Sequence, residues 1–429
     1  MSNWKRELIS NAVAYAVLAC LAAATLIAIY LASPALRRRW LPLARLRPGS
    51  WLGSDVFFTF CAYQGCGLIV FGALFQLGFF RVVYGPGPDV DSPTSEWRIY
   101  MLRCGNLSSP LVFTVTLGVI FTMLFARSGT RPHQFGLTWT RWRANFGLGL
   151  AAFILATPIV LGSYALMSLL MHDRPHPLTE LGRLGLDNWE WLLLGVQALV
   201  AAPLLEEIVF RGILQGWLRR ASFQGHLMVC IMTFVAVVVQ FDSAHAEAID
   251  YVGPVAFGGI LGAGYLFLMF RMKREFQLSA EERLAWQPAP RPVSLESSGA
   301  AAEEVAVALR AQVRADDAAH LGRWADANAT LAILGTAMLF AAFHGQNWPA
   351  PLPLLLLALV LGWLAQRTQS LIAPITLHVL FNFVAFIALY ATATPAPEQN
   401  GNAETTMLRP SVLGSIVSST PGSQLPRRK

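Results

Sequence analysis

The sequence has little charge for its size. Only 13% of its 429 residues are Asp, Glu, Lys or Arg, whereas 55% are hydrophobic. Soluble domains are roughly 25% charged, so this composition excludes an ordinary soluble protein and predicts a polytopic membrane protein. The net charge of +7 comes mostly from arginines in short loops beside apolar runs. That pattern indicates membrane topology, and we expect membrane lipid and no nucleic acid among the partners.

Cysteine and several catalytic motifs are also scarce or missing. The chain has five cysteines, an odd number, and no Cys-x-x-Cys pair: Cys20, Cys61, Cys66, Cys104 and Cys230. A disulfide framework and a thiolate metal site are therefore not indicated. The chain has no His-Glu-x-x-His motif of zinc peptidases and no internal repeat typical of transporters.

Apolar runs long enough to cross a bilayer core of about 30 Å recur along the chain. They are 8–32, 55–83, 109–125, 145–171, 191–217, 226–241, 252–269, 331–344, 351–365 and 371–390. The sequence thus predicts an all-α, multi-pass transmembrane bundle of about ten spans. Arginine-rich loops alternate with acidic ones, and the positive-inside rule then puts both termini outside.

Composition divides the chain into three parts. Residues 1–190 are predicted to form N-terminal transmembrane helices, and 191–391 a second helical region. Within that region we expect an inserted hairpin at about 226–272 and a polar cytoplasmic insert at 273–328. The tail, 392–429, is rich in Pro, Ser, Thr and Asn and is predicted to be disordered.

One apolar run carries three charges. Glu206, Glu207 and Arg211 lie inside Leu199–Leu214, although an ionised group at membrane depth costs at least ~2.5–3.5 kcal/mol. Glu207 and Arg211 stand at i and i+4, share a helix face and can form an ion pair. Glu206 is turned about 100° away from Glu207. It is the carboxylate left without a partner, which suits it to act as a general base.

Two further runs carry polar groups at membrane depth. Phe340 stands four residues before His344, and His378 four residues before Asn382, so each pair shares a helix face. A single intramembrane histidine more often serves a helix–helix hydrogen bond. Together with Glu206, however, these side chains supply a base, two imidazoles and an amide. The combination predicts a hydrolytic site in a cavity within the membrane.

These three motifs, Glu206-Glu207-x-x-x-Arg211, Phe340-x-x-x-His344 and His378-x-x-x-Asn382, resemble those of the CPBP family. That family includes the type II CAAX prenyl endopeptidases and bacterial Abi proteins. The resemblance spans roughly 191–391 and implies an intramembrane glutamate endopeptidase in a bacterial plasma membrane. It gives water activation to Glu206 and binding of the water and the substrate carbonyl to the two histidines. Oxyanion stabilisation falls to Asn382, and the supporting pair is Glu207–Arg211.

The resemblance also implies a substrate class, a membrane-associated protein or a prenylated peptide. The sequence departs from the family pattern between motifs one and two, where two apolar runs and the polar insert intervene. Two alternatives stay open. Glu206, His344 and His378 have the residue types of a three-ligand zinc site, although a metal-free reaction is favoured. The second alternative is a non-catalytic protein of the same fold, with a transporter, immunity or scaffold role.

The polar insert yields the first testable prediction. Because it has no buried apolar run, replacing it with a short Gly/Ser linker should leave peptide-bond cleavage by the purified protein measurable. The assay is turnover in detergent or liposomes, with thermal unfolding as the check on folding. Complete loss of turnover in a well-folded deletion variant would show that the insert gates the site or recruits the substrate.

Overall fold

The computed structural model describes residues 50–89, 94–170, 186–221, 223–239, 248–271, 328–345 and 349–393, together with 22, 23, 25 and 33. They belong to a unit that extends from Met1 to Thr394, and Pro395–Lys429 form a separate unit. Nearly all of the predicted span 8–32 and of the predicted insert, and the predicted disordered tail after 393, lie outside the described residues.

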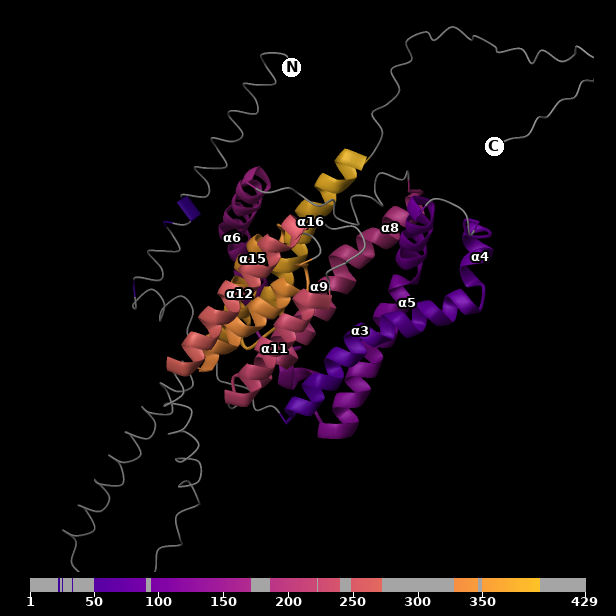
Figure 1. Cartoon of the computed structure of the whole chain (residues 1–429). Helices are drawn as coiled ribbons and strands as arrows, with labels where there is room; N and C mark the ends of the chain where they lie inside the picture. Colours follow the sequence, from indigo (N-terminus) through magenta and orange to yellow (C-terminus); the bar gives the residue numbers. More distant parts are fainter. Residues whose placement is uncertain are drawn as a thin grey trace, which may run out of the picture. The chain divides into compact units, whose positions relative to one another are not determined.

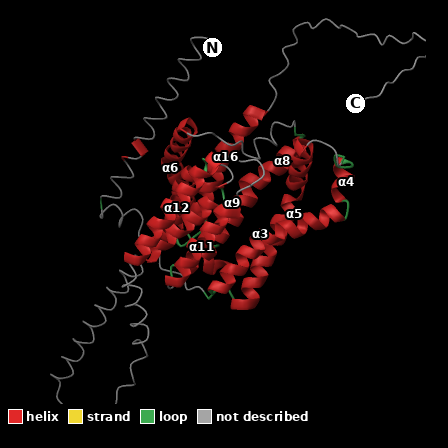
Figure 2. Ribbon diagram, in the orientation of Figure 1, coloured by secondary structure: helices red, strands yellow, loops and turns green. Residues whose placement is uncertain are grey.

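The described residues are helical and contain no strand (Figures 1 and 2). The longer helices are α3 (Gly53–Gln76), α5 (Thr94–Ser128), α6 (Trp142–Leu170), α11 (Phe223–Val239), α12 (Ala248–Arg271), α15 (Pro351–Thr368) and α16 (Ile372–Ala393), and the short helix α4 (Phe79–Tyr84) follows α3. Another helix covers Asn328–Ala342. A continuous composite helix is built from α8 (Asn188–Val196), η2 (Gln197–Ala201), α9 (Ala202–Glu206), η3 (Glu207–Leu214) and α10 (Gln215–Leu218).

The polytopic helical bundle predicted from the sequence is confirmed, but the span lengths differ from the prediction. Six described helices are long and apolar enough to cross a membrane, and three others, 223–238, 255–271 and 328–342, are shorter. The predicted run 55–83 is broken at Gly78, whose φ of 72° ends the helical path between α3 and α4. Glycine adopts this left-handed conformation without the steric penalty that other residues incur.

The composite helix contributes buried side chains to the main hydrophobic core. Every residue of η3 is buried, including its glutamate and its arginine. Ile208, Phe210 and Ile213 pack in one cluster with Phe340 of the neighbouring helix and Phe60 of α3. The site region is therefore surrounded by apolar side chains, and its charged groups depend on one another for solvation.

Helices α6 and α16 pack closely at a small residue. A Cβ atom added at Gly149 would lie 2.6 Å from the Ala373 carbonyl oxygen and 2.6 Å from Thr376 Cβ. Small residues permit this kind of approach between membrane helices. Since α16 carries two of the predicted site residues, this contact helps to fix their position.

The end of the polar insert requires a correction. Asn328, placed in the insert from composition, is 1% exposed. Its Nδ2 donates to the Arg219 carbonyl oxygen at 2.7 Å, and its Oδ1 lies 2.8 Å from His226 Nε2. Composition alone could not detect these partners because they lie more than 100 residues away. A linker replacement must therefore stop before Asn328.

The α6–α16 contact gives a second prediction with an internal control. Gly149→Ala should lower the free energy of unfolding by about 1–3 kcal/mol, since the new methyl group has no space. Gly147 is exposed and has nothing within 4 Å of an added Cβ. Gly147→Ala should leave stability unchanged or raise it by up to ~1 kcal/mol. Thermal unfolding in detergent measures both variants, and equal midpoints would contradict this account of the interface.

Candidate active site

The composite helix is distorted just before the two glutamates. In η2 the Ala202 N–H bonds to the Gln197 carbonyl oxygen, five residues back. Pro203 has no N–H, so the Ala198 carbonyl receives no backbone hydrogen bond from residue 202 or 203. Asn382 of α16 fills this position, and its Nδ2 donates to the Ala198 oxygen at 2.9 Å. A side chain from another helix thus ties α16 to the distorted turn.

Glu207 is the most enclosed charge of the site. Its side chain has no exposed surface, and Arg211 Nη1 lies 3.1 Å from Glu207 Oε1, so the i, i+4 ion pair predicted from the spacing is present. His378 Nδ1 lies 2.9 Å from the same oxygen. A carboxylate only accepts hydrogen bonds, so His378 Nδ1 carries the proton and donates it. Glu207 therefore fixes the orientation of the His378 ring.

Glu206 lies on the other side of the same imidazole. Its Oε2 is 3.7 Å from His378 Nε2, and its side chain is 14% exposed. Because the two ring nitrogens point in different directions, one imidazole reaches both adjacent glutamates. The sequence predicted that the Glu206 carboxylate has no partner, whereas His378 lies beside it. Helix spacing could not predict this neighbour, because His378 is on another helix. Among the residues that the structure describes, no Lys or Arg forms an ion pair with Glu206.

Arg211 lies close enough to Glu207 to form an ion pair, but the angles between its guanidinium and the carboxylate do not suit a hydrogen bond. Nε, Nη1 and Nη2 make no hydrogen bond among the described residues, and Glu207 Oε2 makes none either. The guanidinium carbon lies 4.4 Å from the centroid of the Phe340 ring. Because the ion pair and this aromatic face replace water around the cation, loss of either is expected to be costly.

Phe340 connects the second motif to the rest of the site. Its ring centroid is 4.7 Å from that of His344 and 6.0 Å from that of His378. His344 lies in the turn that follows the helix, and its Nδ1 is 2.8 Å from the Phe340 carbonyl oxygen. A carbonyl accepts only, so Nδ1 donates and the Nε2 lone pair of the neutral ring is left to accept a hydrogen bond.

The arrangement does not match a zinc site. No group of three or more His, Cys, Asp or Glu side chains within the described ranges is placed to hold a metal ion. His378 and His344 each donate Nδ1–H to an oxygen within the protein, so Nε2 is the ring nitrogen that each could offer to a metal. The alternative zinc set of Glu206, His344 and His378 is not assembled in this geometry, and we derive no step through a metal.

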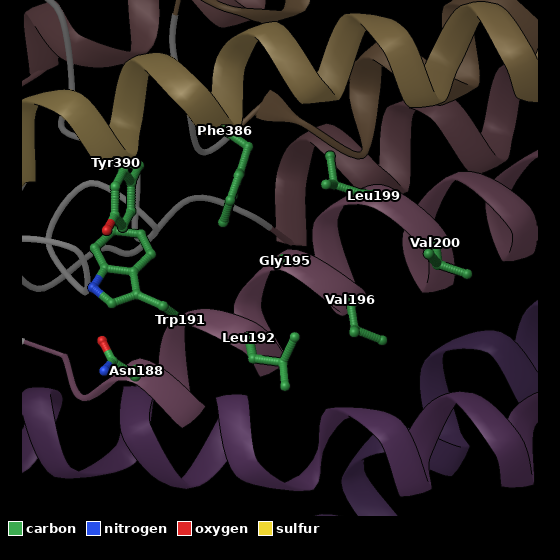
Figure 3. Close-up of a pocket in the computed structure, with 9 residues that line it drawn as sticks. All are labelled: Asn188, Trp191, Leu192, Gly195, Val196, Leu199, Val200, Phe386 and Tyr390. Carbon is green, nitrogen blue, oxygen red and sulfur yellow. The ribbon is translucent and has the colours of Figure 1, made fainter.

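An apolar pocket of about 490 Å³ lies farther back along the composite helix (Figure 3). Its lining comes from α8, η2 and α16: Asn188, Trp191, Leu192, Gly195, Val196, Leu199, Val200, Phe386 and Tyr390. None of the predicted site residues lines it, so the polar cavity expected from the sequence is not this pocket. Two segments that line the pocket, η2 and α16, are also the segments joined by the Asn382–Ala198 hydrogen bond.

Helix α3 contributes aromatic side chains that the motifs did not indicate. Phe60 stacks on Phe343 at 6.0 Å, and Tyr63 packs edge-on against Phe210 at 6.3 Å and Phe343 at 6.4 Å. In the sequence α3 looks like any apolar span, because these residues have neither the spacing nor the charge of a motif. That Phe60 and Tyr63 lie beside the motif-bearing segments is seen only in the structure, where α3 packs against η3.

The fold and site together define a helical membrane protein with a buried carboxylate–histidine–arginine cluster. Residues 188–278 and 300–384 match the family model of Rce1-like type II CAAX prenyl endopeptidases. The match covers less than half of the chain, and it supports the resemblance drawn from the three motifs. Searches of curated proteins and of solved structures gave no match.

The match points to a protease in general. Together with the six helices that are long and apolar enough to cross a membrane, it indicates an integral membrane protein. The unmatched stretch between 278 and 300 lies within the predicted polar insert, which agrees with an insertion between motifs one and two. The helices before residue 188 lie outside the matched region.

Substitution of Glu207 should lower the stability of the protein, whereas substitution of Glu206 should not. Glu207→Gln leaves the buried Arg211 cation without a counter-charge, so it should destabilise the protein by roughly 3–5 kcal/mol. Glu206→Gln removes no such pair and should accumulate like the wild type. Abundance in membranes and thermal unfolding in detergent report the difference. The opposite pattern, an unstable Glu206→Gln and a stable Glu207→Gln, would contradict the assignment.

Proposed function

We propose that the protein is an intramembrane endopeptidase in which Glu206 activates water to hydrolyse a peptide bond of a membrane-associated protein. One observation supports this most strongly. Glu207 is occupied by Arg211 and His378, whereas Glu206 stands beside His378 and is paired with no Lys or Arg of the described segments. The partial exposure of Glu206 suits a group that must meet water and substrate.

The proposed reaction needs no covalent enzyme intermediate. Glu206 takes a proton from water, and the water oxygen forms a bond to the carbonyl carbon of the peptide. The tetrahedral intermediate then breaks its C–N bond, and the proton on Glu206 passes to the leaving amine. Peptide and water become one carboxylic acid and one amine, and Glu206 returns to its starting state.

The remaining polar side chains have supporting roles in this proposal. His344 Nε2 accepts a hydrogen bond and so helps to hold the water. His378 is oriented by Glu207 through its Nδ1–H, and its Nε2 lone pair accepts a hydrogen bond from the water beside Glu206. Asn382 has one N–H directed to the Ala198 carbonyl, and its second N–H is assigned to the developing oxyanion.

The substrate class follows from the family. We propose that the protein cuts a prenylated peptide or a prenylated membrane-associated protein near its C-terminal Cys-a-a-X sequence, because the matched family is described as CAAX prenyl endopeptidases. The probe is a farnesylated, internally quenched Cys-a-a-X peptide presented to the purified protein in liposomes. Wild type should cleave it, and Glu206→Gln should be slower by about 10²–10⁴-fold. Equal cleavage by the two proteins would overturn the mechanism.

The same assay tests the choice of a metal-free reaction. Incubation with 1,10-phenanthroline or EDTA should leave the rate of peptide cleavage unchanged. The control is an established zinc peptidase treated in parallel. Inhibition that is reversed by added zinc would contradict the metal-free mechanism while leaving the protease assignment intact.

A further inference from the structure

The apolar pocket of about 490 Å³ lies between two helices that are long and apolar enough to cross a membrane. The composite helix forms one wall through α8 and η2, and α16 forms the other (Figure 3). The volume is within the range of about 300–1,000 Å³ that is usual for small-molecule sites. Most of the lining is aliphatic or aromatic, so the pocket suits a hydrocarbon chain and offers little to a polar ligand.

Aromatic side chains form a wall at the end of the pocket that is farther from the glutamates. The Trp191 ring lies edge-on to Tyr390 at 5.0 Å and to Phe386 at 6.0 Å. Gly195 is one turn closer to the glutamates, and a Cβ atom added there would lie 3.3 Å from Phe386 Cζ. A larger residue at position 195 would therefore fill space in the pocket or push Phe386 aside.

The opposite end of the pocket adjoins the candidate active site. Leu199 follows Ala198, whose carbonyl oxygen accepts a hydrogen bond from Asn382 Nδ2 at 2.9 Å. On α16, Phe386 is one turn, or roughly 6 Å, beyond Asn382. On the composite helix, Glu206 is about two turns, or roughly 10 Å, beyond Leu199. A chain lying in the pocket therefore has one end beside the proposed catalytic groups.

One side of the pocket is open. Leu192, Val196 and Val200 line it and are 67%, 41% and 54% exposed. Because they belong to a helix that can cross the membrane, their exposed surfaces face lipid rather than water. A hydrocarbon chain that is already in the bilayer can enter from this side without being transferred through water.

We propose that this pocket binds the isoprenoid chain of the substrate and selects its length. The chain is attached to the Cys of the Cys-a-a-X sequence, so it lies close to the peptide bond to be cut. The pocket likewise ends beside Asn382, close to Glu206. Gly195 leaves room for the chain, and Trp191 with Tyr390 limits its length. The choice of an isoprenoid rests on the peptidase function proposed above.

The first test compares two quenched peptides of one sequence, one farnesylated and one carrying the longer geranylgeranyl chain, in liposomes. Gly195→Val should raise KM for the farnesylated peptide by about 10- to 200-fold, because the new side chain occupies the space of the isoprenoid. Trp191→Ala should open the aromatic wall and raise the ratio of kcat/KM for the longer chain over the shorter by about 10-fold. A ratio of this kind does not depend on how much of each variant is folded.

The matched control is a glycine in another membrane helix. Gly118 of α5 is exposed and has nothing within 4 Å of an added Cβ. Gly118→Val makes the same chemical change as Gly195→Val but lies outside the pocket lining. It should leave KM and the ratio between the two peptides unchanged.

The second test measures binding without turnover. The Glu206→Gln protein is mixed in liposomes with the same peptide bearing a photoactivatable diazirine on its farnesyl chain. Irradiation should attach the probe within residues 191–200 and 386–390, as located by mass spectrometry. An excess of farnesylated peptide should prevent this labelling, whereas the same peptide without an isoprenoid should not.

Three results would overturn the pocket assignment and leave the peptidase function standing. They are labelling only outside these two segments, labelling that farnesylated peptide does not reduce, and a Trp191→Ala protein with the wild-type ratio. The second of these would mean that a bilayer lipid occupies the pocket. If the wild type cleaves neither peptide although labelling of the pocket is prevented by farnesylated peptide, the proposed function fails and the isoprenoid site stands.

Discussion

The structure around the site depends on the buried contact of Glu207 with Arg211 and His378. A carboxylate with no exposed surface is tolerable in an apolar bundle only because a cation and a hydrogen-bond donor both meet its Oε1 atom. This contact joins η3 to α16. It also places the second nitrogen of His378 beside Glu206, so a structural ion pair determines the surroundings of the proposed catalytic base.

The backbone of the composite helix contributes in a separate way. Pro203 cannot donate a hydrogen bond, and the five-residue turn of η2 leaves the Ala198 carbonyl for the Asn382 amide. π-Helical turns inside α-helices are rare and are frequent at functional sites. Here η2 and η3 flank α9, the short segment that ends at Glu206, so both sides of the proposed base are irregular.

The sequence predicted the parts of the site that depend on spacing within one helix. The Glu207–Arg211 pair follows from i, i+4 geometry, and His378 and Asn382 both reach the composite helix from the same face of α16. The all-helical membrane fold followed from composition and apolar runs. Contacts between distant segments were beyond such reasoning, because periodicity describes one helix at a time.

Three features show this limit. The link from His378 Nε2 to Glu206 depends on how α16 crosses the composite helix. Tyr63 approaches from a helix whose sequence indicates only an apolar span. Phe340 was recognised as part of a motif, but its position between Arg211 and the two imidazoles appears only in the packed structure.

In the proposed mechanism Glu206 carries out the hydrolytic step and Glu207 supplies the supporting charge. Its most direct test is a quantitative comparison of membrane proteomes from cells with the wild-type protein and cells with Glu206→Gln at matched abundance. The account predicts that a set of membrane-anchored proteins keeps its uncleaved C-terminal peptide only in the Glu206→Gln cells. Identical protein termini in the two membranes, with both proteins folded and present, would contradict it.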